Sequence, residues 1–566
     1  MTDYQIDNKF NDAFRQQALG ISIGERNQLA EFSRLLRTGA KMVEIDLASL
    51  YGYTGEGTPA NRITRTERES IGNLAKTNDM DLSVHAPWSI NFSGINPDPR
   101  SLKKEEEYQE QMRNEMKSAI NFADDVSKRM GREHMPIIFH AASDHLGNPD
   151  PNKRLSVYDN EEEKAMSVGR ERIAMVPGDF KRVYGEETYN KLKFGITPTE
   201  DGKGMTLSPS AALEFYKDQT RMDLNQKRVS LEVSKRNLEM QKMDLANELA
   251  MASANGELQK IDELSKRKTT FDQMEKDLNV QRELLDNAIG RIETRFSRFD
   301  EKAPMLAAEG IKDAALLSLK TKTQPMILVE NTMTPDMSLS RPRDVAEAVA
   351  RARQLFVEEE VKQGMHESDA RKLSEDMIGV NLDVGHLNIF KSYGLKDTDI
   401  TKMLTEGNKV KDEHGNTIFM PNISEFVKRY HLNDNMGDID AHLPLGEGTT
   451  PVKEIFETLQ NAGVAAPAIM EVFGGPGGIE AGMTESMQYL GTPISADMPY
   501  MSPPAYAGKP YSSLIGDYSS SAFYSSLGLR NDLFPSSGFT GLGPILGAGY
   551  MENNRGGGSF SGAPLF

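Results

Sequence analysis

The sequence of 566 residues contains no cysteine. Disulfide bonds and thiolate metal ligands are therefore excluded, and any bound metal ion must be held by nitrogen and oxygen atoms. No apolar run approaches the roughly 18 residues that a membrane-spanning helix requires. The N-terminal segment MTDYQIDNKF lacks the basic start and apolar centre of a secretory signal. The absence of a membrane span and of a secretory signal predicts a cytoplasmic protein without membrane contact.

An excess of basic residues is also missing. The chain has 66 Lys and Arg against 84 Asp and Glu, which gives a formal net charge of -18. A protein that coats nucleic acid by charge alone would have the opposite balance. Bound divalent ions would offset part of the negative charge, so the acidity weakens a nucleic-acid function without excluding it.

Eight short β-rich runs recur along the chain, and each is followed by a stretch long enough for a helix. Strands that alternate with helices predict a parallel sheet, and eight such units predict a (β/α)8 TIM barrel of the α/β class. The runs are LGIS (19–22), MVEIDL (42–47), DLSVHA (81–86), PIIFHA (136–141), MILVEN (326–331), IGVNLD (378–383), VKRYHLND (427–434) and AIMEVF (468–473). Since such a barrel takes about 250 residues, more than half of the chain must be something else.

The largest addition separates the fourth and fifth runs by about 180 residues, far more than an ordinary loop. We expect the barrel in two parts, residues 1–150 and 321–485, with an insertion over 151–320. Apolar residues in the insertion recur every seven positions: Leu224, Leu231, Leu238 and Leu245, then Leu264, Phe271, Leu278, Leu285 and Ile292. This spacing predicts helices at about 209–253 and 257–298 that form an antiparallel coiled-coil hairpin. We interpret the hairpin as a spacer or an arm for protein–protein contact or dimerisation; a substrate-gripping arm is the alternative.

Residues 486–566 form a tail rich in Gly, Ser and aromatic residues, with segments such as YSSLIGDYSSSAFYSSLG. This composition offers no helical or strand period that could be buried, so we predict a disordered tail. Its aromatic residues could bind a partner, but disorder without specific binding is the simpler interpretation.

Histidine, aspartate and glutamate residues fall at or just after the ends of six consecutive predicted strands. In a closed βα barrel the carboxyl ends of the strands meet at one rim, where catalytic groups lie. The residues are His85, His140, Glu330, Asp383, His386, His431, Asp440, His442 and Glu471. One such residue is more often a hydrogen-bonded loop residue than a ligand, but this joint placement is hard to obtain by chance. Four histidines lie outside the pattern: His134, His145, His366 and His414.

These nine ligands exceed the about four that one zinc ion prefers, but they suit a cluster of ions bridged by a carboxylate. The expected cofactor is zinc, up to three ions, with manganese or another divalent ion as the alternative. A pair of such ions can activate water and hold both sides of an in-line displacement at phosphorus. The pattern therefore predicts a metal-dependent phosphodiester hydrolase.

Six segments resemble the endonuclease IV family (AP endonuclease family 2) of the xylose isomerase-like TIM-barrel superfamily. They are HAPWSINFSGINP, IIFHAAS, ILVENT, LDVGH, YHLNDNMGDIDAHLPLGEG and AIMEV. The resemblance covers roughly residues 15–150 and 320–480. It implies a DNA repair enzyme that binds damaged DNA and cuts it 5′ to an abasic site with three zinc ions.

Carried over to this sequence, the family's ligand set implies three metal sites. The first is His85, His140 and Glu330; Glu330 bridges to a second with Asp383, His431 and Glu471; the third is His386, Asp440 and His442. The resemblance also implies catalytic roles for Glu330, Asp383 and Glu471. Candidates for substrate contact are Trp88, Asn91 and Asn433. Trp88, the only tryptophan, either stacks against distorted DNA or fills the rim.

Two departures favour a different enzyme of the same superfamily. Met436 and Ala441 stand where the nuclease family carries basic residues that grip DNA. The same loop equally resembles sugar or sugar-phosphate isomerases and epimerases. In that alternative Glu330, Asp383, His431 and Glu471 bind one ion and the two glutamates move protons. The five remaining ligands would be surplus to such a mechanism, so the complete set favours the nuclease.

A third hypothesis belongs to another class, a scaffold or assembly protein with a vestigial barrel. Its hairpin and tail would then do the binding. An intact ligand set is not expected of an inactive site, which argues against this hypothesis. If the hairpin is an independent arm, deletion of residues 209–298 should spare metal binding.

Overall fold

The computed structural model describes the eight barrel strands, a set of helices and part of the loops. The described residues are 19–23, 29, 32, 42–48, 59–97, 104–142, 154–169, 181–182, 186, 196–198, 205–207, 209–335, 337–411, 417–420, 422–472, 479–490, 559–560 and 563–564. Most of the tail predicted at 486–566 lies outside them. The chain divides into two compact units, residues 1–150 with 299–566 and residues 151–298. Among the described helices, none combines the length and apolar character needed to span a membrane.

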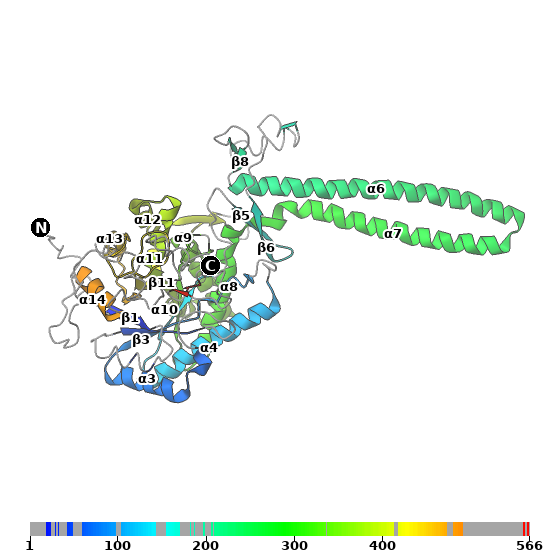
Figure 1. The fold of residues 1–566 in the computed structure, drawn as a ribbon. Helices are drawn as coiled ribbons and strands as arrows, with labels where there is room; N and C mark the ends of the chain where they lie inside the picture. The colour runs from blue at the N-terminus through cyan, green and yellow to red at the C-terminus, as the bar shows by residue number, and fades with distance from the viewer. Residues whose placement is uncertain are drawn as a thin grey trace, which may run out of the picture. The chain divides into compact units, whose positions relative to one another are not determined.

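Eight parallel strands close into a barrel in the first unit (Figure 1). In the order in which they neighbour one another, the strands are β1 (Leu19–Ile23), β15 (Ala468–Met470), β14 (Val427–Leu432), β11 (Ile378–Asp383), β10 (Met326–Glu330), β4 (Pro136–His140), β3 (Asp81–His85) and β2 (Met42–Asp46). Strand β1 pairs with both β15 and β2, which closes the barrel. The eight predicted strands and the TIM barrel are confirmed.

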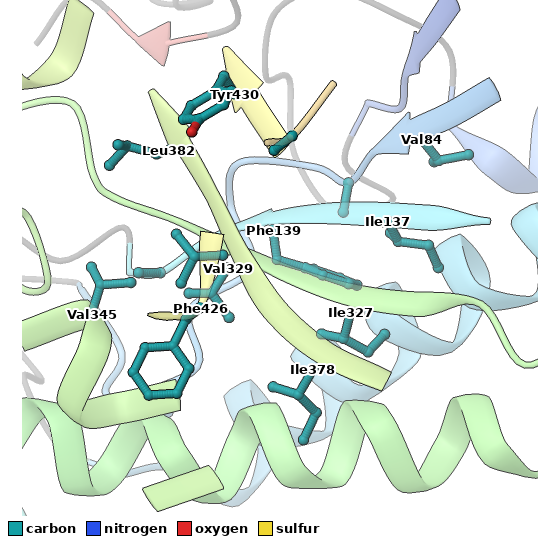
Figure 2. Close-up of a cluster of buried hydrophobic side chains, with 14 of the residues drawn as sticks. Val84, Ile137, Phe139, Ile327, Val329, Val345, Ile378, Leu382, Phe426 and Tyr430 are labelled. Atoms are coloured by element: carbon teal, nitrogen blue, oxygen red, sulfur yellow. The ribbon is translucent and has the colours of Figure 1, made fainter. Parts of the chain in front are cut away.

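Alternating side chains divide each strand between two layers, because successive residues point to opposite faces. One set packs with the surrounding helices and forms the main hydrophobic core; Figure 2 shows part of it, including Ile137, Phe139, Ile327 and Val329. The other set points into the barrel and carries most of the polar residues of the rim. The same alternation that buries the apolar core therefore aims the candidate ligands at one another.

The barrel helices follow their strands, and some of their ends carry recognisable capping features. In α3 (Arg65–Thr77), Thr64 and Glu67 form a capping box. Helix α4 (Glu106–Met130) ends at Gly131 in the left-handed conformation. The remaining helices of this unit are α8 (Phe299–Leu319), α9 (Pro342–Lys362), α10 (Glu367–Met377), α11 (Val384–Asn388), α12 (Asp397–Met403), α13 (Val452–Asn461) and α14 (Ile479–Tyr489). The unit of the insertion ends at Arg298, and not at the expected 320, because α8 packs against α9 and α4.

The second unit contains the predicted helical hairpin on a small sheet. Strands β5 (Arg154–Asp159), β6 (Lys164–Gly169) and β9 (Phe296–Arg298) form an antiparallel sheet, and β7 (Ile196–Pro198) pairs with β8 (Met205–Leu207). Helices α6 (Pro209–Asn255) and α7 (Leu258–Arg295) form the hairpin, whose turn contains Gly256 at φ 72°. The bounds of α6 and α7 agree closely with the helices predicted at about 209–253 and 257–298.

The hairpin seam is built from the predicted apolar positions. Leu238, Leu245, Leu264 and Ile292 are between 1% and 7% exposed. Antiparallel pairing is also visible in the charges along the seam. Arg228 Nη1 lies 3.3 Å from Asp286 Oδ1, and Lys242 Nζ lies 2.8 Å from Glu275 Oε2. The apolar seam is therefore buried between the two helices of a single chain.

Shortening this hairpin should leave the barrel intact. Lys235 Nζ lies 3.0 Å from Asn279 Oδ1, so these two residues stand opposite each other on the two helices. Residues 236–278, which lie between them in the sequence, can therefore be replaced by a short glycine-rich linker. We expect metal content and the melting temperature of the barrel to stay unchanged, because the barrel has its own core. Metal analysis and calorimetry would check this. Loss of bound metal in the shortened chain would contradict the independence of the two units.

Candidate metal centre

The structure brings all nine predicted ligands together at the carboxyl ends of the barrel strands. His85, His140, Glu330 and Asp383 are the last residues of β3, β4, β10 and β11, and Glu471 directly follows β15. His431 lies in β14, His386 lies in α11, and Asp440 and His442 lie in the loop after β14. Closure of the sheet brings these distant sequence positions to one rim.

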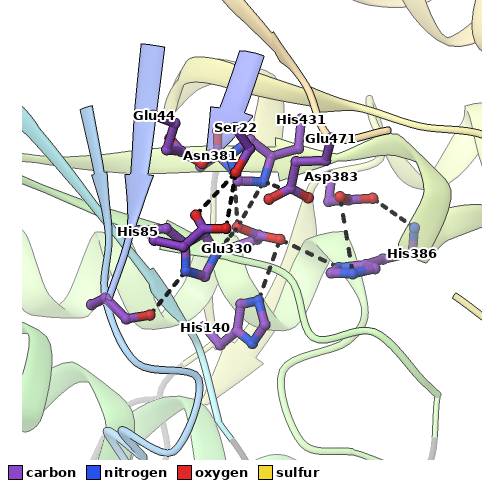
Figure 3. A network of polar contacts seen from close by, with 12 residues as sticks. Ser22, Glu44, His85, His140, Glu330, Asn381, Asp383, His386, His431 and Glu471 are labelled. Atoms are coloured by element: carbon purple, nitrogen blue, oxygen red, sulfur yellow. Dashed lines mark hydrogen bonds and ion pairs between the residues drawn. The ribbon is translucent and has the colours of Figure 1, made fainter. Parts of the chain in front are cut away.

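Glu330 lies at the centre of the cluster and is fully buried. Its Oε2 lies 3.4 Å from His85 Nε2 and 3.1 Å from His431 Nδ1. Its Oε1 lies 3.6 Å from both His140 Nε2 and His386 Nδ1. Figure 3 shows these imidazoles gathered around the one carboxylate. This arrangement suits a carboxylate that bridges two ions.

Two further carboxylates extend the cluster to the remaining ligands. Glu471 Oε2 lies 3.2 Å from His431 Nδ1 and 3.3 Å from His442 Nε2. The oxygens of Asp440 lie 3.3 Å from His442 Nε2 and 3.2 Å from His386 Nε2. The candidate ligands therefore form one continuous network.

Three groups within this network have ligand atoms within 4.8 Å of one another. They are Glu330, Asp383, His431 and Glu471; His85, Glu330 and His431; and Asp383, His386 and His442. The first coincides with the second site that the sequence implies. In the other two, His431 takes the place of His140 and Asp383 takes the place of Asp440.

A short turn after β11 orients two of the ligands. Asp383 caps α11, and its Oδ1 accepts a hydrogen bond from the backbone N–H of His386 at 2.8 Å. Asn433 donates from Nδ2 to Asp383 Oδ2 at 2.8 Å and is fully buried. Gly385 leaves room for this amide, because a Cβ there would lie 1.6 Å from Asn433 Oδ1. Asn433, a predicted substrate contact, is thus in direct contact with a candidate ligand.

Substituting Gly385 with Ala should therefore disturb metal binding. The added methyl must displace the Asn433 amide, and loss of a hydrogen bond that orients a ligand typically weakens metal affinity by about 10- to 100-fold. Competition with a chromophoric chelator would measure the change. Gly290→Ala is a matched control, because a Cβ at Gly290 meets nothing within 4 Å. Equal affinities for both variants would show that the Asn433 contact is dispensable.

The loop after β14 is braced by one buried carboxylate. Asp434 accepts backbone hydrogen bonds from Gly446 and Gly448 on Oδ2 and from Thr450 on Oδ1, at 2.8 to 3.0 Å. Within this braced loop, His442 has a φ of 45°, which is unusual for a residue other than glycine. Such local strain persists only where the surroundings hold it, and it is common at functional sites.

Sequence reasoning missed three polar residues that lie inside the barrel next to the ligands. Glu44 Oε1 lies 2.8 Å from His431 Nε2, and Asn381 Nδ2 donates to Glu330 Oε2 at 3.0 Å. Arg429, on the same strand as His431, is 4% exposed. For two of them the alternation along the strand was the available signal, because Asn381 shares a strand face with Asp383 and Arg429 shares one with His431.

The other two predicted substrate contacts lie in the turn after β3. Trp88 is half-buried, and its Nε1 has no hydrogen-bond partner among the described residues. The side chain of Asn91 serves the turn itself, since Nδ2 donates to Ile95 O and Oδ1 accepts from the N–H of Ser93. Contact of Trp88 and Asn91 with a substrate stays a prediction.

The histidines outside the ligand pattern have other surroundings where the structure describes them. His134 Nδ1 lies 3.0 Å from Gln324 O, and His366 is the N-cap of α10. His145 and His414 lie outside the described residues.

Burial and charge shift the acid–base equilibria of the cluster in opposite directions. Burial opposes ionisation of Glu330, but the neighbouring His431 and His140 outweigh it and hold its pKa well below the usual range. Burial raises the pKa of Asp383 to about 6. For His442, burial is outweighed by Asp440 and Glu471, so its pKa rises to about 9. Burial instead lowers the pKa of His140, so the metal-free cluster holds an ionised Glu330 together with both protonated and neutral imidazoles.

The composition of the cluster fits divalent ions. Five carboxylates whose side chains are at most 10% exposed gather here: Glu44, Glu330, Asp383, Asp440 and Glu471. Within the described residues, neither Glu330 Oε1 nor either ring nitrogen of His431 has a hydrogen-bond partner. Buried charge and unsatisfied polar atoms are costly unless a cation or a partner compensates them. Nitrogen and oxygen donors of this kind suit zinc or manganese.

Comparison with known proteins finds one family model that matches part of the chain. Residues 327–492 match the family described as xylose isomerase-like TIM barrel. The match does not distinguish the endonuclease IV family within that superfamily. No curated protein sequence matches this chain.

Three of the solved structures that match this chain are described as sugar epimerases or as epimerase-like. A D-tagatose 3-epimerase-like protein is 12% identical with a TM-score of 0.38, covering 84% of this chain and 96% of its own. A D-psicose 3-epimerase crystallised with D-fructose is 11% identical with a TM-score of 0.34, covering 84% and 89%. The 3-keto-D-glucoside 4-epimerase of E. coli is 9% identical with a TM-score of 0.36, covering 84% and 100%. Similarity at this level carries no inference about activity.

Proposed function

We propose that this xylose isomerase-like barrel is a divalent-metal-dependent isomerase or epimerase of a sugar or sugar phosphate. The observation that carries the proposal is the group of Glu330, Asp383, His431 and Glu471, which are all buried and whose ligand atoms lie within 4.8 Å of one another. It contains two glutamates, and each has a second oxygen that can exchange a proton with a substrate.

The two glutamates suit proton transfer at carbon. A divalent ion in this group would polarise a carbonyl or hydroxyl oxygen of the substrate. Burial opposes ionisation of Glu471, but His431 and His442 outweigh it and keep its pKa well below the usual range, as found for Glu330. One carboxylate can therefore remove the proton from the carbon beside the carbonyl. The other takes up a proton from solvent and delivers it to the substrate, and the first then releases its proton to solvent, so the product has the same composition as the substrate.

The loop beside the cluster favours a small substrate over a polyanion. From residue 433 to 452 the chain contains no lysine or arginine, and it contains Asp434, Asp438, Asp440 and Glu447. In the same loop Met436 is 45% exposed and Ile439 is 40% exposed. A surface that grips a DNA backbone needs cationic side chains, which this segment lacks.

The second candidate is phosphodiester hydrolysis 5′ to an abasic site in DNA, with up to three zinc ions. Five buried ligands beyond the group of four favour it, namely His85, His140, His386, Asp440 and His442. A single-ion isomerase needs none of these five side chains as ligands. Metal stoichiometry therefore separates the two functions.

Solvent-exchange measurements would test the proposal without knowledge of the product. Protein reconstituted with Mn²⁺, Co²⁺ or Zn²⁺ is incubated in ²H₂O with a panel of ketoses, aldoses and their phosphates. We expect deuterium to enter at the carbon beside the carbonyl of one substrate, as seen by NMR, with one essential ion per chain. No exchange on the panel, together with three bound ions and incision of a duplex that carries one abasic site, would favour the hydrolase instead.

A further inference from the structure

We propose that Glu44 is a positioning residue that fixes His431 for metal binding. This inference rests on the proposed metal site and goes beyond it, since Glu44 belongs to no candidate ligand group. Glu44 lies in the middle of β2, is fully buried, and points into the barrel beside the cluster.

The two nitrogens of His431 face different partners. Nδ1 lies 3.1 Å from Glu330 Oε2 and 3.2 Å from Glu471 Oε2, so it points at the candidate ion position. Nε2 points the other way, 2.8 Å from Glu44 Oε1. With its proton on Nε2, the side that faces the Glu44 carboxylate, the ring would present the lone pair of Nδ1 to the ion. Carboxylates placed in this way fix both the ring orientation and the tautomer of a histidine ligand.

Glu44 is itself held in place. Ser83 on the neighbouring strand donates from Oγ to Glu44 Oε2 at 2.7 Å, and the two residues are register partners. Oε1 lies 2.8 Å from His431 Nε2, a contact of ion-pair distance without the geometry of a hydrogen bond. One oxygen of Glu44 is thus anchored to the barrel wall, and the other is directed at the imidazole.

Arg429 offers an alternative reason for a carboxylate at this position. Its guanidinium is buried near Glu44, and its Nε and Nη1 have no hydrogen-bond partner among the described residues. Glu44 could therefore serve only to balance this buried charge. The two roles differ in what happens when Arg429 is neutralised, because a charge-balancing role then disappears and a positioning role remains.

The test measures metal affinity in Glu44→Leu, Glu44→Gln and the double variant Glu44→Leu with Arg429→Met. Leucine removes the acceptor at nearly constant volume, and glutamine keeps an uncharged acceptor. Zn²⁺ affinity is measured by competition with a chromophoric chelator, and the visible spectrum of bound Co²⁺ reports the geometry of its ligands. Arg429→Met alone and Glu358→Gln on the exposed face of α9 are the matched controls.

We expect Glu44→Leu to weaken Zn²⁺ binding by about 10- to 100-fold and Glu44→Gln by less. The double variant has no unbalanced charge, so it should fold, yet it should bind Zn²⁺ as weakly as Glu44→Leu with an altered Co²⁺ spectrum. Affinity restored by Arg429→Met, or unchanged affinity in Glu44→Leu, would overturn the proposal. A wild-type chain that binds no metal would instead refute the metal site itself, so the two failures are distinguishable.

Discussion

Glu330→Gln is expected to lower turnover by roughly 10³-fold or more, because it removes both a ligand and a proton-transferring group. The substitution keeps the size of the side chain but removes the charge at the centre of four imidazoles. Neutral amides are also weaker ligands for divalent ions than carboxylates, so bound metal should fall together with activity. Both proposed functions require this carboxylate.

The measurement pairs initial rates with metal analysis on the same preparation. Glu358→Gln in α9 is the matched control, since its side chain is exposed and its amide would be equally tolerated. Circular dichroism would show that the barrel remains folded. If the Glu330→Gln variant keeps its bound metal and its full rate, this cluster takes no part in the reaction.

Metal affinity should rise steeply with pH. For His85, contacts with Glu330 outweigh the effect of burial and raise its pKa to about 10, and the pKa of His442 is raised to about 9. In the metal-free protein both imidazoles therefore carry a proton at neutral pH, and a ligand must lose that proton before it binds an ion. Because the free protein holds the extra protons, lower pH favours the metal-free state. Each displaced proton strengthens apparent affinity up to about tenfold per pH unit, or about 100-fold from pH 6 to pH 8.

Titrations with Mn²⁺ at pH 6, 7 and 8, in buffers of different ionisation enthalpy, would count the protons released. His85→Ala should release one proton fewer than the wild type, which gives a shallower dependence. His134→Ala is a suitable comparison, because that histidine lies outside the cluster. An affinity that is independent of pH would mean that these imidazoles are neutral before the ion binds.

Local patterns in the sequence predicted most of the architecture. Short runs rich in apolar and β-forming residues located all eight barrel strands, because the outward face of each strand packs against the helices and must be apolar. Seven-residue spacing located α6 and α7, because an antiparallel pair buries one stripe of each helix. The candidate ligands were found because each is a metal-capable side chain at or near the end of such a strand.

The sequence could not predict which ligands would share an ion or what would support them. His85 and His431 are far apart in the chain, but closure of the barrel stacks their rings with centroids 5.6 Å apart. The turn that holds the amide of Asn91 was not foreseen either, and contact of Asn91 with a substrate stays a prediction. Such pairings depend on the register between strands, which no single segment specifies.

The sequence by itself determined where the strands, the hairpin and the nine metal-capable residues occur, since these follow from side-chain type and periodicity over a few turns or residues. Only the tertiary structure decided that Glu330 lies between four imidazoles and that Glu44 meets the far nitrogen of His431. The physical reason is that alternation tells which residues share a strand face. The distances between residues on different strands are set by closure and stagger of the whole barrel.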